Sequence, residues 1–488
     1  IGRRIVAVEP RMAASKQLLS EFLGTFLLVF TVSCHVLNEA PDTTFVALSI
    51  ASVLMITVYA MGPVSGANFN PAVTLAITLS KKKEWTECLH YVISQLAGAL
   101  CASVMACLLW GNGEVHFGPP FDVIAMLSVF LVEAFYTAML CFVVLSTACV
   151  EKSNQYFGLA IGFVIVAGGS AGGWVSGGAF NPAVALGINM SAFFHSLHMG
   201  WFVFYWAAEC IGACIAAALF AFLRPGEFEG DAKGQDPGEV ELGKKLVAEA
   251  LGTCVLVVTV GLNVLKPAEA ANPDAILSIA ASLLCMVYAL GPVSGAHLNP
   301  AVTVAVALRK GPEAFPSATA LAYIAAQLGG GIFAGLAYFT MSAFHSFPLG
   351  HPDGYPVVDW PLSGSWFGVA LAEFTFTFLL AYVVLATATV STPAAGDMFG
   401  LAIGFAVVAG AYAISPISGG SLNPAVSVAI DLTHLMGFAI NNASFHSRFW
   451  HCAVYSAFEL LGGVLAAVVF SATHPEEGYT AIEENKSV

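Results

Sequence analysis

The feature that most constrains this chain is a box at residues 65–73, Ser-Gly-Ala-Asn-Phe-Asn-Pro-Ala-Val, because three similar boxes follow it. The four share Asn-Pro-Ala, at Asn70-Pro71-Ala72, Asn181-Pro182-Ala183, Asn299-Pro300-Ala301 and Asn423-Pro424-Ala425. Each box follows a run of small residues and precedes about ten apolar residues, half the length that a bilayer-spanning helix requires. We therefore expect each box to open a short half-helix.

The residue types in the box explain why a helix would start there. Asn is a favoured N-cap, and Pro at the first helical position loses only an N–H that has no partner within the helix. A half-helix that begins inside apolar sequence places its N-terminal amides, with about +0.5 charge, at membrane depth. Broken backbone is tolerated there only where it lines protein or a water-filled cavity, so paired half-helices predict a pore or a binding site.

The composition is that of a polytopic membrane protein. Of the 488 residues, 58% are hydrophobic and 10% are charged, against about 25% charged in a soluble domain; the mean hydropathy is +0.81. The net charge of −14, with no sustained basic tract beyond Lys81, Lys82 and Lys83, argues against a nucleic-acid partner. The cysteines lie mostly in apolar runs without metal-ligand spacing, and no catalytic set is visible, so we expect no enzyme, cofactor or metal site. The start, Ile1 to Arg4, is too polar for a signal peptide, which leaves truncation or processing of the N-terminus open.

The chain repeats one plan twice around a charged segment rich in Gly and Pro, which has the composition of a flexible linker. Six apolar spans and two half-helices precede this segment, and the same order follows it. The expected division is an N-terminal segment (1–16), a first membrane domain (17–223), the linker (224–245), a second membrane domain (246–472) and a C-terminal tail (473–488).

A glutamate precedes each box at a nearly constant distance. The separations are 49 residues from Glu21 to Asn70, 48 from Glu133 to Asn181, 50 from Glu249 to Asn299 and 50 from Glu373 to Asn423. Each half therefore consists of two similar quarters. Three spans, an odd number, separate the quarters, so the second is inserted upside down relative to the first, as in inverted-repeat transport proteins.

The basic residues predict the orientation. With the N-terminus inside, 15 of the 17 Lys and Arg residues fall in cytoplasmic segments, and Lys266 and Arg448 are the exceptions. We expect both termini, and the linker, on the cytoplasmic side. The sequence does not indicate which membrane holds the protein.

The inverted pair of Ser-Gly-x-x-x-Asn-Pro-Ala boxes, each after a span with a glutamate, closely resembles the aquaporin or major intrinsic protein family. The resemblance covers residues 17–223 and again 245–472, and the duplication is the departure from the family's usual six spans. It implies two tandem six-helix bundles, all α, with twelve transmembrane helices and four re-entrant half-helices. It also implies one pore per half, in which Asn70 with Asn181, and Asn299 with Asn423, donate amide protons to a passing solute, while two positive helix ends oppose cations.

The family's outer constriction has changed in this sequence. Its positions hold Ile50, Gly169, Gly178 and Val184 in the first half, and Ile279, Ala411, Gly420 and Val426 in the second. Val184 and Val426 stand where the family commonly has Arg, so the resemblance implies a wider, more apolar constriction that would pass glycerol, urea, ammonia or hydrogen peroxide. Other markers favour water, because Ala185 replaces the Asp of glycerol-conducting relatives and Tyr205-Trp206 resembles the aromatic pair of water channels. The solute therefore stays open.

Buried acidic residues have two interpretations. Charge at membrane depth can mark an ion or proton pathway, but in this family the residues at Glu21, Glu133, Glu249 and Glu373 accept hydrogen bonds from the re-entrant backbone, and we favour that structural role. Glu209 and Glu459 occupy the repeat positions of Gln95 and Gln327. For these two we favour buried hydrogen bonding, with a protonation-sensitive gate as the alternative; His297 is expected to line a mouth of the pore, with a pH sensor as the alternative.

The prediction is a passive channel for water or small uncharged solutes that excludes protons and ions. Two alternatives remain, a twelve-span secondary transporter and a non-conducting structural membrane protein. The expected partners are the solute, the lipid bilayer and a second copy of the chain, since two such chains would supply the four barrels of the family's usual tetramer.

Overall fold

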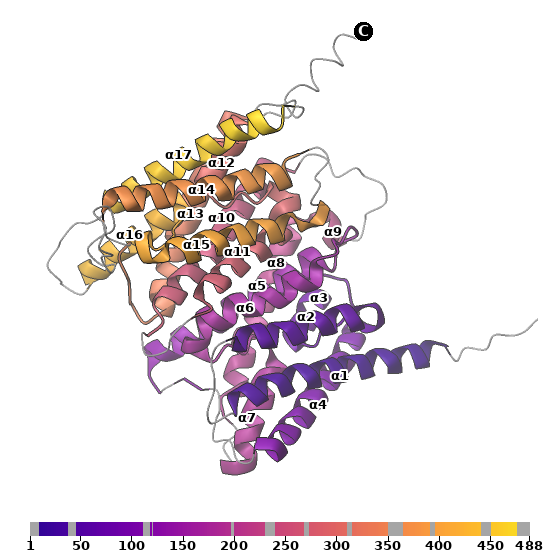
Figure 1. The fold of residues 1–488 in the computed structure, drawn as a ribbon. Coiled ribbons are helices and arrows are strands. Elements are labelled where there is room, and N and C mark those ends of the chain that lie inside the picture. Colours follow the sequence, from indigo (N-terminus) through magenta and orange to yellow (C-terminus); the bar gives the residue numbers. More distant parts are fainter. Residues whose placement is uncertain are drawn as a thin grey trace, which may run out of the picture. The chain divides into compact units, whose positions relative to one another are not determined.

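The computed structural model describes residues 9–37, 45–110, 118–119, 121–196, 200–229, 240–267, 273–309, 315–349, 365–390, 396–440 and 450–475. Within these ranges all regular structure is helical (Figure 1). The chain divides into two compact units, Ile1–Gly234 (unit 1) and Gln235–Val488 (unit 2).

The two units have the same order of helices. In unit 1 they are α1 (Glu9–Val36), α2 (Val46–Ser65), α3 (Pro71–Leu79), α4 (Trp85–Trp110), α5 (Val123–Thr147), α6 (Phe157–Ser176), α7 (Pro182–Ser196), α8 (Phe202–Leu223) and α9 (Pro225–Glu229). In unit 2 they are α10 (Leu242–Val264), α11 (Ala275–Ser294), α12 (Pro300–Leu308), α13 (Ser317–Met341), α14 (Trp366–Ala388), η2 (Gly396–Met398), α15 (Phe399–Ser418), α16 (Pro424–Ile440) and α17 (Trp450–Thr473).

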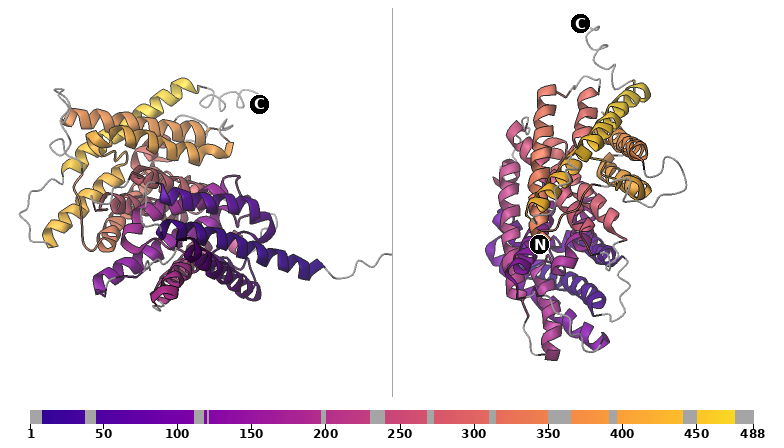
Figure 2. Two further views of the ribbon diagram at one scale, coloured as in Figure 1. Left: turned by 60° about the horizontal axis from the view of Figure 1, so that its bottom comes forward. Right: turned by 90° about the vertical axis from the view of Figure 1, so that its left-hand side faces the viewer.

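Twelve helices in the described ranges are long and apolar enough to cross a bilayer. They are α1, α2, α4, α5, α6 and α8 in unit 1, and α10, α11, α13, α14, α15 and α17 in unit 2. Within unit 2, α15 packs against both α14 and α11, and Figures 1 and 2 show α14 and α15 side by side in orange. The expected class is therefore confirmed: tandem bundles of six spans, each with two half-helices.

The helix before each box ends at a glycine. Gly66, Gly177, Gly295 and Gly419 follow α2, α6, α11 and α15, with φ between +85° and +88°. A glycine adopts this left-handed conformation without the cost of a Cβ, and its N–H bonds the carbonyl four residues earlier. The chain therefore leaves each spanning helix in the same way and turns back into the bundle.

The half-helices differ in length. The helices α3 and α12 have 9 residues each, which matches the apolar run of about ten. The helices α7 and α16 have 15 and 17 residues. They continue through Asn189 and Thr433, whose side chains donate to the carbonyl oxygens one turn earlier, at 2.9 and 2.7 Å.

The segment expected as a linker, residues 224–245, begins and ends in helix. The short helix α9 lies at its start, where Lys82 Nζ is 3.7 Å from a carboxylate oxygen of Glu227, and α10 begins before its end. The start of this segment therefore packs on unit 1. The middle of the segment lies outside the described residues. So do residues 1–8 of the expected N-terminal segment (1–16) and residues 476–488 of the expected C-terminal tail (473–488), whereas residues 9–16 are part of α1.

Four glycines let pairs of spanning helices meet at backbone distance. They are Gly98 on α4 against α1, Gly212 on α8 against α5, Gly330 on α13 against α10 and Gly462 on α17 against α14. A Cβ at any of them would overlap a backbone oxygen of the facing helix. Each glycine also lies three residues after Gln95, Glu209, Gln327 or Glu459, hence on the same helix face. The close crossing therefore brings these four polar side chains against the neighbouring helix and loop.

The crossing at α13 predicts a specific instability. Gly330→Ala would press a methyl group on the backbone of Ala250 and should lower the free energy of unfolding by about 2 kcal/mol, the usual cost of overpacking. Gly329→Ala is the matched control, because a Cβ at the preceding residue meets no atom within 4 Å. Thermal unfolding in detergent measures both, and an equal effect of the two substitutions would contradict the close crossing.

Candidate functional site

In each unit the two Asn-Pro-Ala boxes meet at the starts of their half-helices. The Oδ1 atom of each box asparagine caps its own helix, accepting the amide of the following alanine at 2.8 to 2.9 Å. The Nδ2 group donates across to the residue before the other asparagine: Asn70 to Phe180 O (2.9 Å), Asn181 to Phe69 O (3.0 Å), Asn299 to Leu422 O (2.8 Å) and Asn423 to Leu298 O (2.9 Å). The exchange is reciprocal, so each asparagine is fixed by the opposite loop. Each Nδ2 keeps a second proton.

The glutamate before each box holds the re-entrant loop. Glu249 accepts Ser294 Oγ at 2.6 Å, the amides of His297 and Leu298 at 3.0 and 2.7 Å, and Gln327 Nε2 at 2.8 Å. Glu21 makes the same four bonds in its quarter, Glu133 accepts a serine hydroxyl and two loop amides, and Glu373 accepts two loop amides. All four side chains are fully buried. They supply the partners that the broken backbone needs where no lipid can supply them.

These bonds offset local backbone strain. Phe69, Phe180, Leu298 and Leu422, the residues before the four box asparagines, have φ between +47° and +55°. A non-glycine residue costs about 1 kcal/mol or more in this region, and it persists only where its surroundings determine it. The strain turns the four carbonyl groups toward the opposite box, where they accept the asparagine protons.

The next layer of hydrogen bonds differs between the first and the second box of each unit. Gln95 Nε2 donates to Thr74 Oγ1 at 2.9 Å, and Gln327 Nε2 donates to Thr303 Oγ1 at 2.8 Å. At the other two boxes, Glu209 Oε1 accepts the amide of Asn181 at 2.9 Å, and Glu459 Oε1 accepts the amide of Asn423 at 3.0 Å. The glutamine side chains therefore donate to a threonine hydroxyl of the half-helix, whereas the glutamate side chains accept the backbone amide of the box asparagine. Sequence reasoning missed Thr74 and Thr303, although both stand four residues after a box asparagine.

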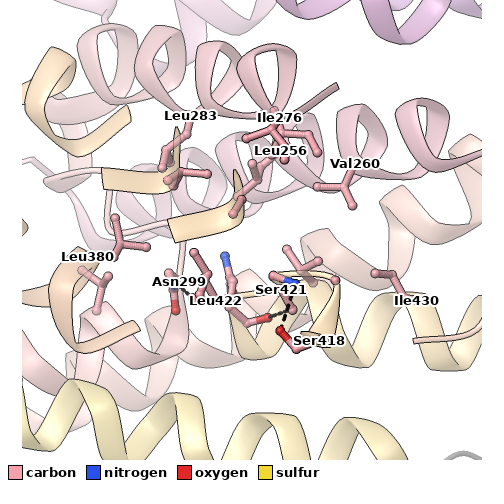
Figure 3. A pocket seen from close by; sticks show the side chains of 18 of the residues that line it. Leu256, Val260, Ile276, Leu283, Asn299, Leu380, Ser418, Ser421, Leu422 and Ile430 are labelled. Atoms are coloured by element: carbon pink, nitrogen blue, oxygen red, sulfur yellow. Dashed lines mark hydrogen bonds between the residues drawn. The ribbon is translucent and has the colours of Figure 1, made fainter. Parts of the chain in front are cut away.

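Unit 2 contains a partly open cavity of about 160 Å³ at the meeting point of its boxes (Figure 3). Asn299, Asn423 and His297 line it, and so do the four expected constriction residues Ile279, Ala411, Gly420 and Val426. Most of the wall is aliphatic, and Figure 3 shows Leu256, Leu283 and Leu380 around Asn299. The volume is enough for several water molecules. The structure thus brings the two box asparagines and the four expected constriction residues of this half to one cavity, whereas Pro300, Ala301, Pro424 and Ala425 do not line it.

In unit 1, one buried cluster links two of the expected constriction residues, Ile50 and Val184. Ile50 packs against this cluster, which contains Val184. A Cβ at Gly169 would lie 3.3 Å from the side chain of Ala47, which is on the same helix as Ile50. Gly178 has φ of +70°, as Gly420 has +72° in unit 2, so a side chain at either would be strained.

His297 belongs to a hydrogen-bonded chain at one end of the cavity. Its Nδ1 lies 3.2 Å from Thr303 Oγ1, and the rings of Phe315 and Tyr323 lie 5.1 and 5.3 Å from the imidazole. Thr303 Oγ1 also donates to Asn299 O at 3.1 Å, and with its single proton used there it can accept from the Nδ1–H tautomer of His297. Asn68 takes this place in unit 1 and donates to Thr74 Oγ1 at 3.1 Å. Among the described residues, no group of three or more His, Cys, Asp or Glu side chains could hold a metal ion.

Comparison of the sequence with known proteins identifies one family. A family model described as major intrinsic protein matches residues 9–220, 156–268 and 236–470. Glycerol uptake facilitator protein-like 6 of Lactiplantibacillus plantarum is 31% identical over 211 residues, 41% of this chain and 95% of that protein. Nodulin-26 of Glycine max is 31% identical over 215 residues, 43% of this chain and 78% of its own. Aquaporin A of Dictyostelium discoideum is 32% identical over 230 residues, 44% of this chain and 81% of its own.

A solved aquaglyceroporin of Plasmodium falciparum is 17% identical, with a TM-score of 0.38; the match covers 44% of this chain and 99% of the solved one. The sequence relatives likewise match less than half of this chain but most of themselves, as expected for a tandem duplication. Because the family model matches both halves, this multi-pass membrane protein belongs to the major intrinsic protein family, whose members are channels for water or small solutes.

Proposed function

We propose that each unit forms its own pore, which passively conducts water and small uncharged solutes such as glycerol, urea, ammonia or hydrogen peroxide and excludes protons and other ions. The observation that carries the proposal is the reciprocal asparagine pair beside the cavity of unit 2. The second Nδ2 proton of Asn299 and of Asn423 is then available to a solute oxygen or nitrogen in an otherwise aliphatic passage.

The same arrangement supports the exclusion of cations. Two half-helices meet with their N-termini together, so two partial positive charges of about +0.5 act at one point of the passage. A cation would lose hydration between aliphatic walls and gain no compensating negative charge, because Glu249 and Glu373 face the loop amides. A neutral solute loses far less, which is why we assign uncharged solutes.

The constriction residues support a permissive passage. Val426 and Gly420 line the cavity of unit 2 where a filter with a guanidinium would be narrower and more polar, and we assign Val184 and Gly178 the same role in unit 1. The filters are thus Ile50, Gly169, Gly178 and Val184, and Ile279, Ala411, Gly420 and Val426.

The arrangement in the membrane follows from the charge distribution. We assign cytoplasmic N- and C-termini, with channel domains at residues 17–223 and 246–472, because this orientation keeps most Lys and Arg inside. We also propose that two chains associate, so that four barrels form one assembly.

Blocking each passage separately tests the two-pore proposal. Val184→Trp and Val426→Trp place an indole at equivalent buried positions of the first helical turn, where no positive φ opposes a side chain. In proteoliposomes under sucrose and then glycerol gradients, stopped-flow light scattering should show that each single variant loses part of the water and glycerol permeability. The double variant should be as tight as protein-free vesicles.

The control for this experiment is Val468→Trp, which makes the same change on an exposed face of α17, 61% accessible, and should conduct like the unchanged chain. If the unchanged chain, at verified incorporation, is no leakier than empty vesicles, the proposed conduction is wrong. If one block alone abolishes all flux, only one unit conducts.

The positive field predicts the effect of a charge at the box. Asn423→Asp keeps an acceptor for the amide of Ala425 but replaces the donor to Leu298 O with a negative charge. We expect proton conductance to rise at least several-fold, because the carboxylate cancels the helix-end charge that opposes cations. A pH-sensitive dye inside vesicles under a potassium diffusion potential measures it. Adding Val426→Trp should remove the leak, and a leak that persists would not pass through the pore.

A further inference from the structure

A chain of three side chains leads from the cavity of unit 2 into the protein. Ser421 lines the cavity and is partly accessible, whereas Ser427 and Glu459 are fully buried. Ser421 Oγ lies 2.7 Å from Ser427 Oγ, and Ser427 Oγ lies 3.0 Å from Glu459 Oε1. Figure 3 shows Ser421 beside Ser418 at the wall of the cavity.

The direction of this chain is fixed by counting protons. Glu459 Oε1 accepts the backbone amide of Asn423 and, as a carboxylate or as a carboxyl group protonated at Oε2, has only lone pairs to offer Ser427. Ser427 must therefore donate its single proton to Glu459. It has none left for Ser421, so Ser421 is the donor in the bond between the two serines.

Another contact of the Ser421 hydroxyl has the same sense. Its Oγ lies 3.3 Å from the carbonyl oxygen of Asn423, which can only accept. These contacts use the proton of the hydroxyl group, so its lone pairs have no donor among them, and the residue itself lines the cavity. A hydroxyl that could point either way in isolation is held here as an acceptor.

We propose that Ser421 determines specificity in unit 2, as a fixed hydrogen-bond acceptor for neutral solutes that carry O–H or N–H donors, namely polyols and amides, with Ser427 and Glu459 as the residues that position it. This inference rests on the proposed conduction and deepens it. A polyol hydroxyl beside the box finds a donor in Asn423 and an acceptor in Ser421, two residues apart.

Because the wall of the cavity is aliphatic, a single hydrogen-bond acceptor can have a large effect on which solutes pass. A donor group that enters an apolar passage without a partner loses its hydration at a cost comparable to a hydrogen bond. A water molecule can donate hydrogen bonds to the neighbouring water molecules in the passage. A polyol displaces those waters and depends on the wall, so removal of Ser421 Oγ should slow a polyol much more than it slows water.

Unit 1 provides an internal comparison. Ala179 and Ala185 stand at the positions of Ser421 and Ser427, counted from the box asparagine. Glu209 still accepts the amide of Asn181, and within the described residues its Oε2 has no hydrogen-bond partner, as is also true of Glu459 Oε2 in unit 2. Unit 1 thus has the terminal acceptor but lacks the hydroxyl relay, so its ratio of glycerol to water permeability should be lower than that of unit 2.

The test measures this ratio in chains with one pore blocked. In Val184→Trp, where unit 2 conducts, Ser421→Ala should lower the glycerol-to-water ratio by about five-fold, the factor for a neutral hydrogen bond of about 1 kcal/mol. In Val426→Trp, where unit 1 conducts, the pair Ala179→Ser and Ala185→Ser should raise the ratio. Water permeability, measured in the same vesicles, should change little in either case.

The positioning role of Ser427 is tested by an isosteric pair. Ser427→Thr keeps the hydroxyl and should keep the ratio; Thr303 stands at the equivalent position of the first box of unit 2. Ser427→Val has the same shape without the hydroxyl and should lower it, because Ser421 is no longer held as an acceptor. A purely structural role would give the two variants the same ratio.

The outcomes separate this inference from the proposed function. If water passes but Ser421→Ala leaves the ratio unchanged, or the serine pair in unit 1 does not raise it, the specificity role is wrong and the channel proposal stands. If no chain conducts water, the proposed function and the inference both fail. Three results together support the inference. The glycerol-to-water ratio falls in Ser421→Ala and in Ser427→Val, it is unchanged in Ser427→Thr, and it rises when the two serines are introduced into unit 1.

Discussion

The interaction on which the rest of this structure depends is the bond between a buried carboxylate and the backbone of a re-entrant loop. A half-helix that starts inside a bilayer leaves amides that lipid cannot satisfy. Glu21, Glu133, Glu249 and Glu373 each accept two consecutive amides of such a loop, and in return the loop surrounds each carboxylate with donors. The left-handed residues before the box asparagines, the capping of the half-helices and the crossed asparagine bonds all follow from a loop held in this one shape. The carboxylate and the loop amides thus satisfy each other, which offsets the free-energy cost of burying a charge and of interrupting a helix backbone inside the bilayer.

The structure also requires close helix crossings, because the polar side chains of the spanning helices must reach the re-entrant loops. The glycine three residues after Gln95, Glu209, Gln327 or Glu459 brings two helices together at the level of the loop, so a side chain of ordinary length can contact both. The backbone geometry is repeated in all four quarters, whereas the side-chain chemistry is not. Glutamine donates at the first box of each unit and glutamate accepts at the second, which reverses the sense of the hydrogen bonds on a common scaffold.

Much of this architecture could be predicted from the sequence, because Asn-Pro at a helix start and a glutamate about 50 residues earlier have local physical meanings. The gathering of Ile279, Ala411, Gly420 and Val426 on one cavity followed from counting residues to the boxes. The hydroxyl of Ser427 could not be singled out, since a serine in an apolar helix more often bonds its own backbone than a distant carboxylate. The crossed asparagine bonds needed the folded loops, because each partner carbonyl lies more than 100 residues away along the chain. The extent of α7 and α16 was also missed, since their second halves carry polar residues that bond within the helix.

The division into two units has a consequence for how this protein can vary. When identical subunits assemble, a substitution in the gene alters every barrel at once, so a change that suits one solute is imposed on all passages. Here the two barrels are encoded separately within one chain, and their walls already differ, with Ala179 and Ala185 in one and Ser421 and Ser427 in the other. The two proposed permeation paths can therefore diverge while translation keeps them in a strict one-to-one ratio.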